Sequence, residues 1–124
     1  MAYDNENIFA KILRGEIPNN TVYEDENILA FHDIAPKTPV HVLVIPKGAY
    51  IDMDDFAANG TAAEIGNFFA KVGEIARGLG VHEQGYRMVT NNGENAGQIV
   101  PHFHVHIMGG QKIKEGSMAR GMNN

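Results

Sequence analysis

Apolar residues recur at helical spacing over the segment that follows Thr61. They are Ile65, Phe68, Phe69, Val72, Ile75 and Leu79. Thr61 and Glu64, three residues later, form a capping box, which marks the N-terminus of a helix. The pattern therefore predicts one long amphipathic helix that ends near Gly78 and Gly80.

A shorter apolar stripe near the start of the chain predicts a second helix. Its members are Ile8, Phe9, Ile12 and Leu13. Asp4 and Asn5 can cap this helix, and Gly15 is placed to end it.

Segments rich in β-branched and aromatic residues predict five strands. We expect them at Thr21 to Glu24, Ile28 to Asp33, Val40 to Ile45, Gly85 to Asn91 and about Ile99 to Met108. Loops between successive strands are short, which favours antiparallel pairing. The order αβββαββ predicts an α+β fold, with an antiparallel sheet and the long helix on one of its faces.

The chain reads as a single domain. It has 124 residues, which suits one hydrophobic core and is short for two. We expect an ordered core from about residue 4 to 110 and a mobile tail over 111–124, where the sequence shows no regular pattern.

Composition excludes several kinds of chemistry and partner. Cysteine is absent, so the sequence has no disulfides, thiol nucleophiles or thiolate metal ligands. The net charge of −5 argues against a broad nucleic-acid-binding surface. The sequence has no apolar run of about 18 residues, and its start is polar and acidic, so we expect a cytoplasmic protein without a membrane contact.

Half of the six histidines fall within five residues, at His102, His104 and His106. On a strand these side chains share one face, while Phe103 and Val105 enter the core from the other. A row of imidazoles can donate hydrogen bonds to a phosphate while one neutral ring attacks phosphorus. We therefore expect nucleophilic chemistry at this strand.

Two other interpretations of the histidine row stay open at this point. The three side chains could be ordinary polar residues on an outer face, although outer faces usually carry Thr, Lys and Glu. Alternatively, two histidines two residues apart could share a zinc ion, with Asp33 or His41 as a third ligand.

The segment His102-Phe103-His104-Val105-His106-Ile107-Met108 resembles the signature of the histidine triad family at every position. Segments similar to that family recur in its order along nearly the whole chain: 8–12, 16–18, 30–34, 41–47, 85–87 and 97–98. The pair Gly109-Gly110 resembles the Hint branch, whose members are nucleoside phosphoramidases, more than the dinucleoside polyphosphate hydrolases of the fragile histidine triad branch.

The resemblance implies roles for four histidines. His104 would be the nucleophile that forms a nucleotidyl-imidazole intermediate, which water then hydrolyses. We expect its other ring nitrogen to donate to a backbone carbonyl, that of His102. His106 would contact the phosphate, and His41 would support it from a neighbouring strand.

The resemblance also implies a nucleotide pocket. Asp33 would bind the ribose hydroxyls, although alone it also fits a turn before Pro36. Ile8, Phe9, Ile17, Phe31 and Ile34 resemble an apolar clamp around a purine, and His32 lies among them; each apolar residue alone could equally be core. The glycines at 93 and 97 would let backbone N–H groups approach the phosphate. The remaining positions implied for the nucleotide site are Asn91, Gly97, Gln98 and Ile99, beside His104 and His106.

Two positions depart from the family pattern. Ile99 stands where Hint proteins often carry a serine that helps to protonate the leaving group, so a different leaving-group preference is implied. Asn7 and Ala10 stand where many prokaryotic members carry a zinc-binding Cys-x-x-Cys pair. We therefore expect no structural zinc there.

We expect a metal-independent hydrolase of purine nucleoside phosphoramidates and related nucleotidyl conjugates. The resemblance implies no cofactor and a homodimer with a sheet continuous across the interface. The alternatives are a nucleotide-binding interaction module and a metal-dependent hydrolase built on the same histidines.

Overall fold

The computed structural model describes residues 2–114, so positions 115–124 of the predicted mobile tail (111–124) lie outside this range. Its elements are α1 (Ile8–Leu13), β1 (Thr21–Glu24), β2 (Ile28–His32), β3 (Val40–Pro46), α2 (Met53–Asn59), α3 (Ala62–Gly78), β4 (Arg87–Val89), a short 3₁₀ turn η1 (Glu94–Ala96) and β5 (Val105–Gly109). None of the described helices is both long and apolar enough to cross a membrane.

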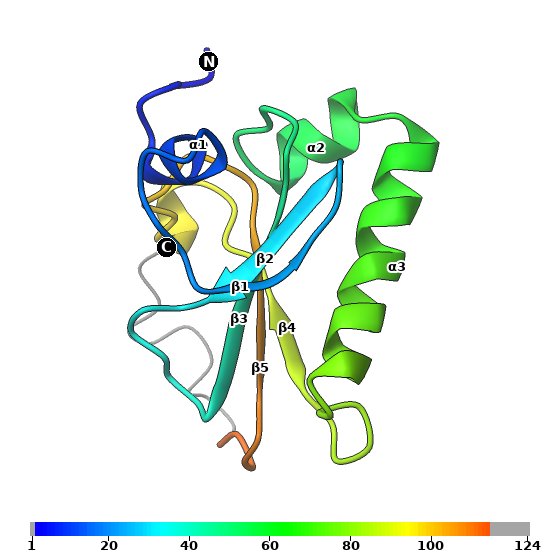
Figure 1. The fold of residues 1–124 in the computed structure, drawn as a ribbon. Coiled ribbons are helices and arrows are strands. Elements are labelled where there is room, and N and C mark those ends of the chain that lie inside the picture. Colours follow the sequence, from blue (N-terminus) through cyan, green and yellow to red (C-terminus); the bar gives the residue numbers. More distant parts are fainter. Residues whose placement is uncertain (1, 115–124) are drawn as a thin grey trace.

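The five strands form one antiparallel sheet in the order β1-β2-β3-β5-β4. This confirms the predicted α+β class. Figure 1 shows α3 along one side of the sheet and α1 on the other. Helix α2 was not predicted, because only Phe56 of its seven residues is buried and no apolar stripe marks it.

The helix N-caps agree only in part with those predicted from the sequence. Thr61 caps α3 as predicted, since its side chain accepts from the backbone N–H of Glu64 at 3.0 Å. The Glu64 carboxylate, however, accepts from the Tyr50 hydroxyl at 2.6 Å. The predicted cap of α1 is wrong: Asn7 is the N-cap, and its side chain accepts from the N–H of Ala10 at 2.9 Å.

Each face of the sheet has its own core. The face toward α3 carries the larger cluster, with Val42, Val44, Phe103, Val105 and Ile107 packed against Phe68, Val72 and Phe56. The opposite face carries a smaller cluster of Phe9, Ile12, Leu29, Phe31, Leu43 and Ile45. Phe103 and Val105 therefore enter the core as predicted, and Ile107 does so as well. The intervening histidines, His104 and His106, belong to the α1 side.

The two C-terminal strands are shorter than the sequence suggested. Strand β4 covers Arg87–Val89 and β5 covers Val105–Gly109. Residues 90–104 instead form a long loop, in which Phe103 donates its backbone N–H to the Tyr50 carbonyl at 2.7 Å. This bond joins the histidine-containing segment to the loop that precedes α2.

Candidate active site

The three histidines of the predicted row are buried, with exposed fractions of 0% for His102, 1% for His104 and 0% for His106. This burial contradicts the alternative in which the three side chains are ordinary polar residues on an outer face. Only His106 lies within β5, and the other two precede it. Helix α1 contributes to the burial, because its Phe9 ring packs edge-on against His104 with centroids 5.0 Å apart and against His102 with centroids 6.3 Å apart.

His104 carries a defined tautomer. Its Nδ1 lies 2.7 Å from the backbone carbonyl oxygen of His102. A carbonyl oxygen only accepts hydrogen bonds, so Nδ1 carries the proton. The lone pair of the neutral ring is therefore on Nε2, as a nucleophile requires.

A second chain of hydrogen bonds fixes His41 and His106. The backbone N–H of Lys37 donates to Nδ1 of His41 at 3.0 Å. A neutral His41 then carries its proton on Nε2, which donates to Nδ1 of His106 at 2.9 Å. His106 in turn carries its proton on Nε2, so that this nitrogen is a donor. Burial lowers the pKa of His41 against the opposing effect of the Asp33 carboxylate, which favours this neutral arrangement.

Asp33 lies directly after β2, beside this pair. Its Oδ2 is 3.4 Å from Nε2 of His41, and its Oδ1 accepts from the N–H of Ala35 at 2.8 Å. The second contact is the turn role that the sequence also allowed. The structure thus brings Asp33 to the histidines, and its ribose role stays a prediction.

His102 supports the site with its ring as well as its carbonyl. Its Nε2 donates to the Pro46 carbonyl at 2.8 Å, and the Tyr3 hydroxyl contacts its Nδ1. Burial lowers the pKa of His102 to about 4. Sequence reasoning missed Tyr3, and no local pattern could have shown it, because 99 positions separate the two residues.

The loop before the histidines is held by Gln98. Its Oε1 accepts from the N–H of Gly93 at 2.8 Å, and its Nε2 donates to the carbonyls of Ile51 at 2.8 Å and Val100 at 3.0 Å. These bonds give Gln98 a structural function in addition to its predicted nucleotide contact. Gly97 has a φ of 80°, a conformation that favours glycine.

Asn91 offers a donor that the fold does not use. Its side chain is buried, and its Nδ2 makes no hydrogen bond to any residue in the range 2–114. A buried amide without a partner is costly, which suits a group that binds a ligand.

The predicted apolar clamp divides into two groups. Phe9 and Phe31 are buried and meet edge-to-face, with Ile17 packed against their cluster. Ile8 and Ile34 are instead exposed by 44% and 99%, and Ile99 by 66%. His32 is also exposed. The role of the isoleucines in a purine clamp stays a prediction.

One cluster of the described residues has metal-ligand chemistry. A ligand atom from each of Asp33, His41 and His106 lies within 4.8 Å of the others. The neutral imidazoles and the carboxylate suit zinc, although His41 and His106 already hydrogen-bond to each other.

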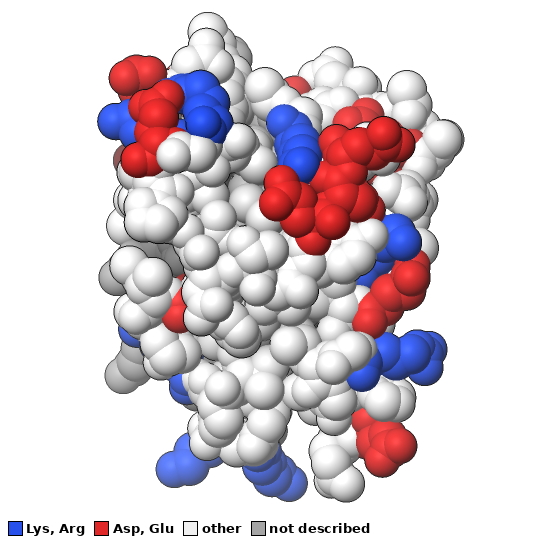
Figure 2. Space-filling view, in the orientation of Figure 1, with Lys and Arg blue, Asp and Glu red and all other residues white. Residues whose placement is uncertain are grey.

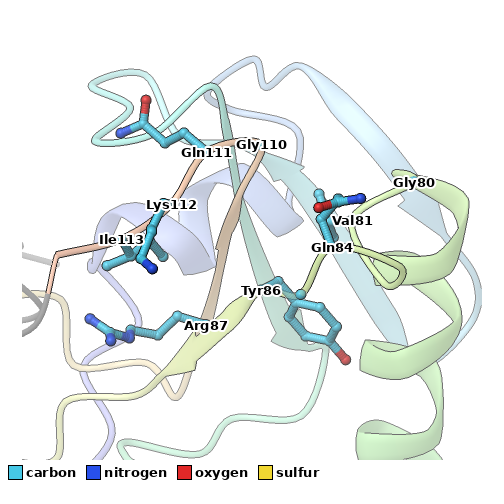
Figure 3. A pocket seen from close by; sticks show the side chains of 10 residues that line it. Gly80, Val81, Gln84, Tyr86, Arg87, Gly110, Gln111, Lys112 and Ile113 are labelled. Carbon is cyan, nitrogen blue, oxygen red and sulfur yellow. The ribbon is translucent and has the colours of Figure 1, made fainter.

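A large cavity lies away from the histidines. It measures about 590 Å³ and lies beside β4, between Tyr86, Arg87 and the segment 110–113. Figure 3 shows the Arg87 side chain reaching toward Lys112 and Ile113.

The face seen in Figure 2 has an uncharged centre, with acidic and basic groups toward its margins. It therefore shows no broad basic surface.

The fold and the cluster of buried, hydrogen-bonded histidines define a class of small α+β proteins. The HIT domain model matches residues 14–113, and the chain belongs to this family. A HIT-like protein of Azospirillum brasilense is 59% identical over 90% of this chain and 91% of its own.

Two further relatives bear on activity. The purine nucleoside phosphoramidase of Escherichia coli K12 is 39% identical over 87% of this chain and 90% of its own. The solved HIT family hydrolase from Legionella pneumophila superposes with a TM-score of 0.84 at 38% identity, covering 90% and 98% of the two chains. These similarities support a hydrolase of the HIT family.

The low pKa of His102 predicts acid sensitivity of the fold. The unfolded chain takes up this proton near pH 6.5, and the folded chain only near pH 4. The free energy of unfolding should therefore fall as the pH drops through this window, by about 3 kcal/mol at its lower end. His41 adds an effect of the same sign, because its pKa is also lowered.

Urea denaturation between pH 7 and 4.5 measures this dependence. His82 lies exposed in the turn after α3, so His82→Asn should keep the wild-type slope, whereas His102→Gln should flatten it. A wild-type free energy of unfolding that does not change between pH 6.5 and 5 would refute the assignment.

Proposed function

We propose that this protein hydrolyses purine nucleoside phosphoramidates and related nucleotidyl conjugates, without a metal, through a covalent bond to His104. The observation that carries the proposal is the bond from Nδ1 of His104 to the His102 carbonyl, which leaves the lone pair on Nε2. The phosphoramidase of Escherichia coli, at 39% identity, supports the substrate class.

The proposed reaction has two displacements at the α-phosphorus. Nε2 of His104 forms a bond to phosphorus as the bond to the leaving group breaks, and the departing amine takes a proton from water. The imidazole becomes cationic, and its Nδ1–H bond to the His102 carbonyl strengthens. Water then attacks phosphorus and gives a proton to the hydroxide left by the first displacement. The bond from phosphorus to Nε2 breaks, which releases the nucleoside monophosphate and restores the neutral ring.

The neighbours of His104 supply charge stabilisation in this scheme. Nε2–H of His106 and Nδ2 of Asn91 are donors for the phosphoryl oxygens, on which negative charge develops. The Lys37 backbone N–H holds the His106 donor in place through His41, so the main chain preorganises this part of the site.

We expect His104→Asn to abolish turnover of adenosine 5′-phosphoramidate while binding of AMP persists. The change removes the nucleophile and keeps a polar side chain of smaller volume in the buried position. Initial rates and calorimetric AMP titration measure the two effects. His82→Asn is the matched control, because it removes an exposed histidine outside the site.

A His104→Asn protein with more than about a hundredth of wild-type turnover would contradict the nucleophile assignment. AMP binding by a wild-type protein that shows no turnover would instead support the nucleotide-binding interaction module.

A metal-dependent hydrolase is the second candidate, and the cluster of Asp33, His41 and His106 favours it. The same assay decides, if it is run with and without a chelator. Turnover insensitive to the chelator supports the proposed mechanism, whereas loss of turnover with recovery on added zinc supports the metal.

Asp33 should select ribonucleotides, because each carboxylate oxygen can accept a ribose hydroxyl beside its present contact. Asp33→Ala should weaken AMP binding and reduce the preference over 2′-deoxy-AMP, by about 1.5 to 3 kcal/mol for each lost bond. Asp25→Ala is the control, since Asp25 also accepts from backbone N–H groups in a turn. Undiminished sugar discrimination by Asp33→Ala would leave only the turn role.

We also propose a homodimer in which the sheet continues across two copies of β4. This strand ends the sheet order, and Met88 on it is 51% exposed. An unpaired edge strand is a ready site for pairing. Sedimentation should show a dimer that Met88→Glu weakens; a monomeric wild type would rule the arrangement out.

A further inference from the structure

Tyr3 lies against the first histidine of the triad, although it precedes α1. Its hydroxyl oxygen is 2.5 Å from Nδ1 of His102. The two rings also meet edge-on, with centroids 5.6 Å apart and planes inclined by 73°. A hydrogen bond and a ring contact thus tie the start of the chain to the active site.

The direction of this bond follows from the other side of the His102 ring. Nε2 lies 2.8 Å from the Pro46 carbonyl, which can only accept, so the proton of the neutral ring is on Nε2. Nδ1 is therefore an acceptor, and the Tyr3 O–H is its donor. Burial raises the pKa of Tyr3, which keeps the hydroxyl protonated.

His102 is also the residue that orients the proposed nucleophile. Its carbonyl accepts from Nδ1 of His104 at 2.7 Å, and its own backbone N–H donates to the Val100 carbonyl at 2.9 Å. Its ring is held by Tyr3 and Pro46, so the side-chain contacts fix the main-chain carbonyl that sets the His104 tautomer. A shift of the His102 ring would move that carbonyl.

We infer that Tyr3 is a positioning residue for the reaction: its hydroxyl holds His102, and His102 in turn holds His104 in the attacking orientation. The kinetic part of this inference rests on the proposed hydrolase function. The structural part, the bond from Tyr3 to His102, does not.

Tyr3→Phe isolates the hydroxyl, because phenylalanine keeps the ring contact. Nδ1 of a ring with 0% exposure then loses its donor. The His102 ring is then expected to shift or become more mobile. Its carbonyl would move with it, and His104 would be misaligned in the chemical step. We expect kcat for adenosine 5′-phosphoramidate to fall by about 3- to 10-fold, the loss of one neutral hydrogen bond, with KM changed by less than about twofold.

The control is Tyr23→Phe. Tyr23 donates its hydroxyl to Asp25 at 2.7 Å on β1, so the variant loses a tyrosine hydrogen bond away from the histidines. Its kcat should match that of the wild type. Nitrogen-15 NMR of the histidine rings gives the second readout: the Nδ1 resonance of His102 should shift in Tyr3→Phe and stay in place in Tyr23→Phe.

The two readouts separate the possible failures. A shifted His102 resonance together with lower kcat in Tyr3→Phe alone supports the inference. Unchanged kcat in an active enzyme overturns it, as does an equal loss in both variants. If the wild type does not turn over the substrate, the proposed function fails, and an unshifted His102 resonance would then overturn the structural part as well.

Discussion

The bond from Nδ1 of His104 to the carbonyl of His102 is the interaction on which the site depends. It places the lone pair of a buried ring on Nε2, the nitrogen that attacks phosphorus in the proposed reaction. Main-chain groups fix the neighbouring rings in the same way. The Pro46 carbonyl accepts a hydrogen bond from the His102 ring. The Lys37 N–H donates to the His41 ring, which in turn donates to His106. Because backbone groups cannot change their donor or acceptor character, neutral histidines have one consistent pattern of protons here.

Burial and strand pairing maintain that pattern. The α1 helix covers the histidine side of the sheet, and desolvation lowers the pKa values of His102 and His41. Antiparallel pairing of β3 with β5 sets Leu43 opposite His106 and brings His41 close to it. Burial therefore favours the neutral forms of His102 and His41.

The sequence predicted those features that local patterns encode. The period of the apolar residues and the Thr61 cap located α3, and the strand at Thr21–Glu24 has the predicted bounds. The alternation at 102–107 correctly separated core side chains from histidines. Helix α2 was not predicted, because a segment with one buried side chain has no periodic pattern of apolar residues.

Features that depend on contacts distant in sequence could not be predicted. What covers the histidines is decided by how α1 packs, which no spacing within residues 99–108 reveals. The contact of Tyr3 with His102 and the hydrogen bond from Gln98 to the Ile51 carbonyl likewise join segments far apart along the chain. The roles of Asp33 and the apolar clamp came from family resemblance and stay predictions.

The most direct test of this account is capture of the covalent intermediate. Wild-type protein would be mixed with adenosine 5′-phosphoramidate, quenched rapidly at alkaline pH, which preserves phosphorus bonds to histidine nitrogen, and analysed by peptide mass spectrometry. The account predicts one adenylyl group on His104, with His102 and His106 unmodified. Turnover without any adenylylated histidine, or adenylylation at another histidine, would contradict it.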